Sequence, residues 1–373
     1  MSSPSSPGSP STCTSPCTPR RLYDQFSRSE KLDEKPPLKP NDHTYTPYKR
    51  NDTNLSCTST CMSEAQGITN ASPGSPASPG SPGPPGSPSS PGSPSTCTSP
   101  CTPSEANKEQ MLRKLKEFQL RIEEVSQLRI LLHGPIGAGK SSFINSVNTV
   151  LQGHITIAAL ADSAAGKSFT IKFKTHRLKK GGPGAYYPFV FSDIMGLEPG
   201  TSEGVHTNDI INILEGHVRN GYTFNPVSPL DKRDKYYYSN PGLKDKVHCL
   251  VSVLPADKIS IISDEVIVKM KTVRERARNL DIPQVVIMPM VDTACPLVHE
   301  DLKKIYTSKK IKEKMQECSN RLGVPMNCIF PVKNYNEEVT NDLHLDILIL
   351  MALTNIIMFA NDYVEEQIFA DNE

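Results

Sequence analysis

The stretch Gly134-Pro135-Ile136-Gly137-Ala138-Gly139-Lys140-Ser141 matches the G-x-x-x-x-G-K-[ST] phosphate-loop pattern at every fixed position. An apolar run from Leu128 to Leu132 precedes it and predicts a buried strand. Apolar residues recur at helical spacing between Ser141 and Leu151 and predict a helix after it. A strand, a glycine turn and a helix N-terminus together point main-chain N–H groups and a partial positive charge at one place, so the sequence predicts a phosphate-binding site there.

Each part of this loop has an expected chemical role. The side chain of Lys140 would reach the β- and γ-phosphates, and the Ser141 hydroxyl would be a ligand of Mg²⁺. The rest of the predicted nucleotide contacts come from the turn and the start of the helix: Gly134, Gly137, Ala138, Gly139 and Ser142.

A second metal element is predicted after the next buried strand. Tyr187 to Ser192 is apolar or aromatic and ends at Asp193-Ile194-Met195-Gly196. In this position the Asp would hold Mg²⁺ through water and the Gly196 N–H would contact the γ-phosphate. An Asp that only caps a turn remains the alternative interpretation. A further metal hydroxyl would come from Ser168 or Thr170, and the sequence favours neither strongly; Thr170 is our choice.

The guanine-reading pattern [NT]-K-x-D is present only in part. A buried strand, Val285 to Met290, runs into Pro289-Met290-Val291-Asp292, in which only Asp292 matches. An aspartate here would accept hydrogen bonds from the guanine N1–H and exocyclic amine, whereas a plain turn residue at the strand end is the alternative. The next strand, Cys328 to Val332, leads to Lys333 at the expected last nucleotide loop.

Alternating strands and helices between residues 128 and 366 predict a three-layer α/β domain with a mostly parallel sheet and helices on both faces. The sequence also predicts a half-exposed charged strand over 168–178 and a buried strand over 247–254. Two helices are expected, one within 201–216 and one capped by Ser263, and residues 220–246 form a long loop. In the half-exposed strand, Lys174 and His176 are expected to share the exposed face. The last helix, 343–366, reads as a core helix because polar residues interrupt it, and residues 367–373 as a short tail.

The N-terminal part has a different composition. Residues 1–103 are dominated by Ser, Pro, Gly and Thr, and we expect them to be disordered. The 17 residues from Ser3 to Pro19 recur letter for letter from Ser87 to Pro103, which indicates a duplication rather than a structural repeat. Three C-x-x-x-C pairs lie here, with spacing that is poor for zinc. Residues 104–127 predict an amphipathic leading helix that packs on the domain, or, as a second interpretation, mediates self-association.

The whole chain of 373 residues has a formal net charge of +1, which gives no reason to expect a nucleic-acid partner. We expect no membrane span, because no stretch has roughly 18 uninterrupted apolar residues. The first twenty residues lack an apolar core, so we expect no secretory signal, a cytoplasmic location and reduced cysteines.

Between Leu128 and Glu366 the chain contains the blocks LRILLHGPIGAGKSSFINSV, VFSDIMGLE, NPGLKDKVHCLVSV, FPVKNY and ILILMALTNIIMFANDYVEE. Through these blocks it resembles the interferon-induced protein 44 and 44-like family. The resemblance implies a GTPase-like domain in a cytoplasmic, interferon-responsive protein of antiviral innate immunity. Some members carry a TLDc domain in front of this part, where this chain has its Ser/Pro-rich tail.

Three functions are consistent with these residues. The first is binding of GTP or GDP with Mg²⁺ and slow or partner-dependent hydrolysis, because Leu197 follows Gly196 where a Ras-like protein has its water-orienting Gln, and no catalytic residue is identified. The second is an interaction scaffold for unidentified protein partners, in which the nucleotide only stabilises the fold. The third is an ATP-using phosphate-loop protein, because the guanine motif is incomplete.

Overall fold

The computed structural model describes residues 105–371 except 158, 160–169 and 183. The expected disordered tail, its duplicated segment, its three cysteine pairs and Ser168 all lie outside the described residues. The helices and strands are α2 (Glu105–Glu117), β1 (Leu128–His133), α3 (Lys140–Gln152), β2 (Lys174–Lys179), β3 (Tyr186–Asp193), α4 (Thr207–Leu214), β4 (Cys249–Val253), α5 (Asp264–Asn279), β5 (Gln284–Met288), α6 (Val291–Ala294), α7 (Pro296–Glu300), α8 (Lys309–Leu322), β6 (Ile329–Pro331) and α9 (Leu343–Asp371).

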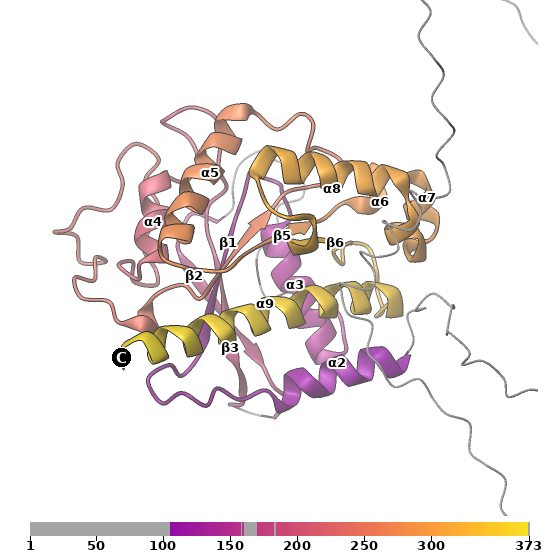
Figure 1. Ribbon diagram of the computed structural model, residues 1–373, viewed down its shortest axis with the longest axis horizontal. Coiled ribbons are helices and arrows are strands. Elements are labelled where there is room, and N and C mark those ends of the chain that lie inside the picture. The colour runs from indigo at the N-terminus through magenta and orange to yellow at the C-terminus, as the bar shows by residue number, and fades with distance from the viewer. Residues whose placement is uncertain (1–104, 158, 160–169, 183, 372–373) are drawn as a thin grey trace, which may run out of the picture. The chain divides into compact units, whose positions relative to one another are not determined.

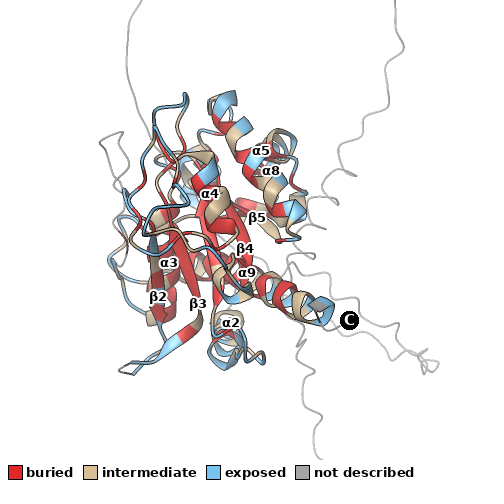
Figure 2. Cartoon of the chain, turned by 90° about the vertical axis from the view of Figure 1, so that its left-hand side faces the viewer, coloured by how far each residue is buried: buried red, intermediate tan, exposed pale blue. Residues whose placement is uncertain are grey.

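A six-stranded sheet forms the centre of the domain, in the order β2-β3-β1-β4-β5-β6. Every neighbouring pair is parallel except β2 and β3, which are antiparallel and place β2 at one edge. The central strands are apolar because both faces are covered, and Figure 2 shows them as buried. This confirms the predicted three-layer α/β architecture with a mostly parallel sheet.

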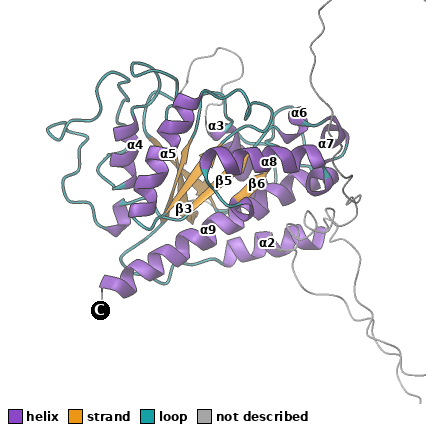
Figure 3. Cartoon of the chain, turned by 45° about the horizontal axis from the view of Figure 1, so that its top comes forward, coloured by secondary structure: helices purple, strands orange, loops and turns teal. Residues whose placement is uncertain are grey.

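Two groups of helices cover the sheet. On one side α4 packs on α5 and α5 packs on α8 and β4, whereas α3 packs on α9 and on the β2–β3 edge. Helices α2 and α9 lie side by side in Figures 1 and 3 and are among the most closely packed pairs of helices. An ion pair between Lys108 Nζ and Asp346 Oδ2, at 2.8 Å, joins these two helices. The leading helix therefore packs on the domain.

The leading helix is shorter than its predicted span. It ends at Glu117, and residues 118–127 form an irregular segment into β1. Phe118, Leu120 and Ile122 alternate with exposed residues and pack against the core. Side chains that alternate in this way indicate an extended chain, so residues 118–127 do not continue the helix that the apolar spacing predicted.

Strand β2 is half-exposed and charged, as predicted, but it begins later, at Lys174. The prediction that His176 is exposed with Lys174 is wrong, because His176 is buried together with Leu178. His176 lies opposite Phe191 of β3, so neighbouring side chains cover it. Lys174 and Lys179 remain exposed on this edge strand.

Helix α9 is longer than predicted and extends to Asp371, so the expected tail at 367–373 is helical over most of its length. Its length and mean hydropathy of 2.0 would allow it to cross a membrane, but 67% of the apolar window is buried within the domain. Asp346 in its first turn is fully buried and accepts a hydrogen bond from Tyr335 Oη at 2.7 Å. These contacts are those of a core helix.

Candidate nucleotide-binding site

The phosphate loop connects β1 to α3 as the sequence predicts. Gly134 has a φ of 152°, and a Cβ added there would lie 2.2 Å from the Val253 carbonyl oxygen, so the turn begins pressed against β4. Gly139 has a φ of 90° and is the residue from which α3 starts. Only glycine adopts both conformations readily, so the loop geometry depends on the glycines of the motif. Gly137 is exposed at the loop tip, and Ala138 is buried beneath it.

Lys140 is buried inside the loop. Its Nζ donates to the carbonyl oxygens of Gly134 at 3.2 Å and Pro135 at 2.9 Å. Burial lowers the pKa of Lys140 to about 8, and the charge of Asp193 only partly offsets that effect. A buried ammonium group held by two neutral carbonyls would gain strongly from a nearby phosphate.

The predicted metal residues converge on one carboxylate. Ser141 Oγ donates to Asp193 Oδ2 at 2.6 Å, and Thr170 Oγ1 donates to the same oxygen at 3.4 Å. Asp193 is 2% exposed at the end of β3, and its Oδ1 has no hydrogen-bond partner among the described residues. Thr170 thus lies beside Asp193, and its role as a metal ligand stays a prediction.

This donor set fits Mg²⁺. A buried carboxylate oxygen without a partner and two adjacent hydroxyls are hard oxygen ligands, and Mg²⁺ usually completes its shell with water and substrate phosphates. Within the described residues there is no group of three or more His, Cys, Asp or Glu side chains that could enclose a metal by itself.

The segment after Asp193 is bonded to the loop. Leu197 N donates to Gly134 O at 3.0 Å, and Ile136 N donates to Leu197 O at 3.3 Å. A Cβ on Gly196 would lie 2.7 Å from Ile136 N, so only glycine fits there. Gly196 thus lies against the phosphate loop, and the N–H of Ile136 donates to the Leu197 carbonyl oxygen.

Asp292 and Lys333 are also brought together. Asp292 lies in the first turn of α6, at the end of β5, and Lys333 follows β6. Lys333 Nζ lies 3.8 Å from Asp292 Oδ2 and 2.6 Å from Glu338 Oε1. Asp292 therefore lies in the first turn of a short helix, and its carboxylate is close to Lys333 in the last loop.

Two residues that were not predicted as contacts connect these loops to the phosphate loop. Asn334 Nδ2 donates to Gly139 O at 3.2 Å, and a Cβ on Gly139 would lie 3.5 Å from Pro289 Cγ. Met290 beside it has a φ of 61°, which is uncommon for a side chain of this size. Asn334 directly follows Lys333, and Pro289 occupies the first position of the guanine pattern. Their places in these two loops were the one feature of the sequence that could have identified them as contacts.

The carbonyl oxygen of Ser142, in the first turn of α3, accepts a hydrogen bond from Ser146 Oγ at 2.8 Å. Ser146 Oγ in turn accepts from Tyr335 N at 2.9 Å. The last loop is thus attached to the first helix behind the phosphate loop.

Solved structures with a similar fold are remote. Toc33 from Arabidopsis thaliana, solved in complex with GDP and Mg²⁺, is 12% identical, with a TM-score of 0.39 over 68% of this chain and 92% of that chain. A probable GTP-binding protein engB is 14% identical, with a TM-score of 0.33 over 63% of this chain and 98% of that chain.

Sequence relatives are closer, although no protein-family model matches the chain. Interferon-induced protein 44 from Homo sapiens is 35% identical over 259 residues, which are 69% of this chain and 58% of that protein. Interferon-induced protein 44-like from Homo sapiens is 31% identical over 260 residues, which are 70% of this chain and 57% of that protein. The chain thus spans less than two thirds of the length of these curated relatives. Over the matched part, this chain belongs to the interferon-induced protein 44 and 44-like family.

Proposed function

We propose that this domain binds a guanine nucleotide together with Mg²⁺. The observation that supports this most directly is the contact of Ser141 with Asp193, at the N-terminus of α3 and beside the buried Lys140. When bound, Mg²⁺ would be held by Ser141 and by Asp193, directly or through water, and would offset charge on the phosphates. Lys140 and the main-chain N–H groups of the loop would hold the phosphate oxygens.

The choice of guanine rests on Asp292. Its carboxylate lies at the end of β5; the loop after β6 contacts the phosphate loop through Asn334 and Gly139, and Pro289 after β5 lies near Gly139. A carboxylate accepts from both guanine donors, whereas adenine presents no such pair of donors on its Watson–Crick edge. Lys333, whose Nζ lies 2.6 Å from Glu338 Oε1 and 3.8 Å from Asp292 Oδ2, places a positive charge beside that carboxylate.

Hydrolysis in our proposal is slow or depends on a partner. Leu197 is 1% exposed, and its N–H and carbonyl groups are both bonded to the phosphate loop. An apolar side chain in this position cannot orient an attacking water molecule. A partner that supplied an amide or a guanidinium group would accelerate the reaction.

The direct test is Asp193→Asn, with Asp231→Asn in the exposed loop as the matched control. In the full chain, Asp193→Asn should weaken Mg²⁺-dependent binding of a fluorescent GDP analogue by at least about 10-fold, because a neutral amide is a poor Mg²⁺ ligand. Asp231→Asn should leave it unchanged. Equal binding by both variants would remove the proposed metal site.

We also propose, from the homology, that the protein is cytoplasmic and acts in interferon-induced antiviral innate immunity. The Lys140→Ala variant tests how the nucleotide contributes. If antiviral activity in cells persists after nucleotide binding is lost, the domain acts as an interaction scaffold and the nucleotide has only a structural role.

A further inference from the structure

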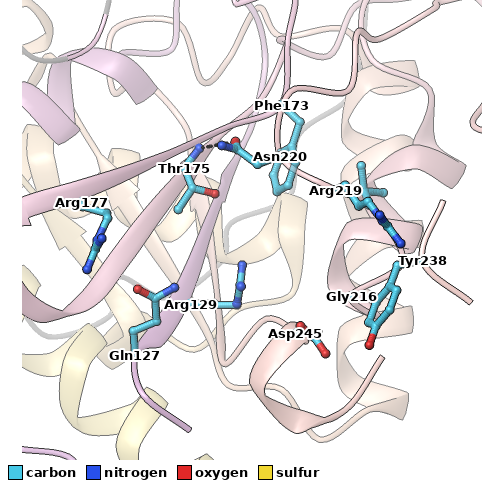
Figure 4. Close-up of a pocket in the computed structure, with 11 residues that line it drawn as sticks. Gln127, Arg129, Phe173, Thr175, Arg177, Gly216, Arg219, Asn220, Tyr238 and Asp245 are labelled. Atoms are coloured by element: carbon cyan, nitrogen blue, oxygen red, sulfur yellow. Dashed lines mark hydrogen bonds between the residues drawn. The ribbon is translucent and has the colours of Figure 1, made fainter. Parts of the chain in front are cut away.

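A second cavity lies at the end of the sheet opposite the phosphate loop. It is about 380 Å³ in volume and is lined by the start of β1, by β2, by the segment after α4 and by the long loop before β4. Figure 4 shows three arginines around it, one from each of the first three of these segments: Arg129, Arg177 and Arg219. No part of the proposed nucleotide site contributes to its lining.

The sheet places two of these arginines on the same face. Arg129 of β1 and Arg177 of β2 both lie opposite Val190 of β3, which runs between them. Strands are about 4.8 Å apart, so the two Cα atoms are separated by about 10 Å. Side chains that lie opposite one another in neighbouring strands project from the same face, so Arg129 and Arg177 both project from the side of the sheet that borders the cavity.

The three guanidinium groups are held by uncharged neighbours. Arg129 Nε donates to the Lys244 carbonyl oxygen at 2.7 Å. The Cζ atom of Arg177 lies 4.4 Å from the ring centre of Tyr186, and that of Arg219 lies 5.5 Å from the ring centre of Tyr238. These contacts orient the side chains without neutralising them.

The described lining carries more positive than negative charge. Within the described part of the chain, no carboxylate forms an ion pair within 4.0 Å of any of the three arginines. Among the described lining residues Asp245 is the one acidic side chain; its charge acts on Arg129, and its Oδ2 accepts from Gly242 N at 3.1 Å. Three arginines against one aspartate leave two positive charges, which match a dianion.

Hydrogen-bond donors are also available. Asn220 Oδ1 accepts from Thr175 N at 3.1 Å, which fixes the amide and leaves its NH₂ group free to donate (Figure 4). Guanidinium groups bind phosphate oxygens in a forked arrangement with two parallel hydrogen bonds. The cavity volume lies near the lower end of the range for small-molecule sites, about 300–1,000 Å³.

We propose that this pocket binds the phosphate group of a small phosphomonoester. The site goes beyond the proposed nucleotide function and is separate from it. The phosphate loop follows the other end of β1, and six strand residues span roughly 20 Å. Loss of nucleotide binding should therefore leave this pocket intact.

The test is calorimetric titration of the full chain in a Lys140→Ala background, which suppresses phosphate binding at the loop. The probes are inorganic phosphate, ribose 5-phosphate and, as the neutral control, ribose. We expect at least one phosphate probe to bind with 1:1 stoichiometry and ribose not to bind. Binding of both phosphate probes would mean that the phosphate group alone is recognised, and binding of ribose 5-phosphate only would identify an organic phosphate.

Two variants assign the binding to the pocket. Arg177→Gln and Arg219→Gln change exposed side chains, so the fold should persist, and each should weaken binding at least about 10-fold. Arg233→Gln, an exposed arginine outside the pocket, should have no effect. The proposal is overturned if neither phosphate probe binds at about 10 mM, or if the pocket variants bind as well as Arg233→Gln. Neither result would bear on the nucleotide site.

Discussion

The hydroxyl of Ser141 lies 2.6 Å from Asp193 Oδ2, although 52 residues separate them in the chain. The contact joins the first residues of α3 to the end of β3, which are held together because β3 is the direct neighbour of β1 in the sheet. Two residues predicted as metal ligands from separate motifs are thus adjacent. In the proposed Mg²⁺ site this arrangement would lower the entropy cost of binding, because neither side chain would have to be reoriented far.

Replacing Ser141 by alanine tests the metal-binding part of the site by itself. In Ser141→Ala the Mg²⁺ concentration required for half-maximal binding of a fluorescent GDP analogue should rise at least about 10-fold, since one oxygen ligand is lost. Thr272→Ala, which removes a hydroxyl that only contacts its own helix, is the control. An unchanged Mg²⁺ requirement in Ser141→Ala would show that Ser141 is not a ligand.

Lys140 should give the unliganded protein a distinctive dependence on pH. Burial lowers its pKa to about 8 from an ordinary value of 10.5, so between these values the unfolded chain binds more protons than the folded one. The free energy of unfolding should therefore rise with pH, by about 2 kcal/mol between about pH 8 and pH 10 from this group alone.

The measurement compares urea unfolding of the wild type with that of Lys140→Met at several pH values. All other groups titrate in both proteins, so the difference between the two curves reports Lys140. The difference should shrink when nucleotide is bound, because phosphate stabilises the ammonium form. Parallel curves in the absence of nucleotide would argue against the burial of a charged Lys140.

The glycines of the loop should differ in what they tolerate. In Gly134→Ala the new Cβ would lie 2.2 Å from the Val253 carbonyl oxygen, so the chain must shift, and we expect a loss of at least about 4 kcal/mol of stability. In Gly137→Ala the Cβ meets nothing within 4 Å, and only the φ of 66° costs about 1 kcal/mol. Thermal unfolding of both variants checks this order, and a reversed order would mean that the loop has a different conformation.

The Asp292→Asn variant should change the base that is preferred. The asparagine NH₂ group can donate to the 2-oxo group of xanthine, whereas it cannot accept from the guanine amine as well as a carboxylate does. We expect GTP binding to weaken about 10- to 100-fold and XTP binding to improve. Equal losses for both nucleotides would indicate that Asp292 supports the loop but does not contact the base.

The leading helix should depend on the Lys108–Asp346 ion pair. Asp346 is fully buried and the Lys108 side chain is 23% exposed, so Lys108→Met should cost about 2 kcal/mol, which is less than breaking a fully buried pair. Adding Asp346→Asn should restore part of that loss by removing the unpaired charge. If the double variant is no more stable than Lys108→Met, the pair does not hold α2 in place.

Most of the fold could be predicted because buried parallel strands are continuous apolar runs. β1, β4 and β5 each follow this pattern, and the N-cap of α5 is Ser263 as predicted, with its Oγ accepting from Glu265 N at 3.2 Å. Helix α8 was not predicted, although Ser308 caps it and its buried residues have helical spacing: Ile311, Met315, Cys318 and Leu322. Nine of its fourteen residues are charged or carry a side-chain amide, so the apolar stripe is narrow and was overlooked.

The motif residues of the candidate site could be identified in the sequence, but the contacts between its loops could not. Ser141 and Asp193 are visible as motifs, whereas Thr170 gave only a choice between two hydroxyls. Asn334 reaches Gly139 across 195 residues, and no local pattern encodes such a contact. The second cavity was also not predictable, because Arg129, Arg177 and Arg219 come from three segments that only the sheet brings together.

The central claim is tested most directly by competition on the purified full chain with Mg²⁺ present. A fluorescent GDP analogue should bind with 1:1 stoichiometry, and GTP or GDP should displace it at concentrations where ATP does not. The Lys140→Ala variant should bind it at least about 10-fold more weakly, because a charged hydrogen bond to phosphate is lost. An analogue that fails to bind, or one that ATP displaces better than GTP, would contradict the account.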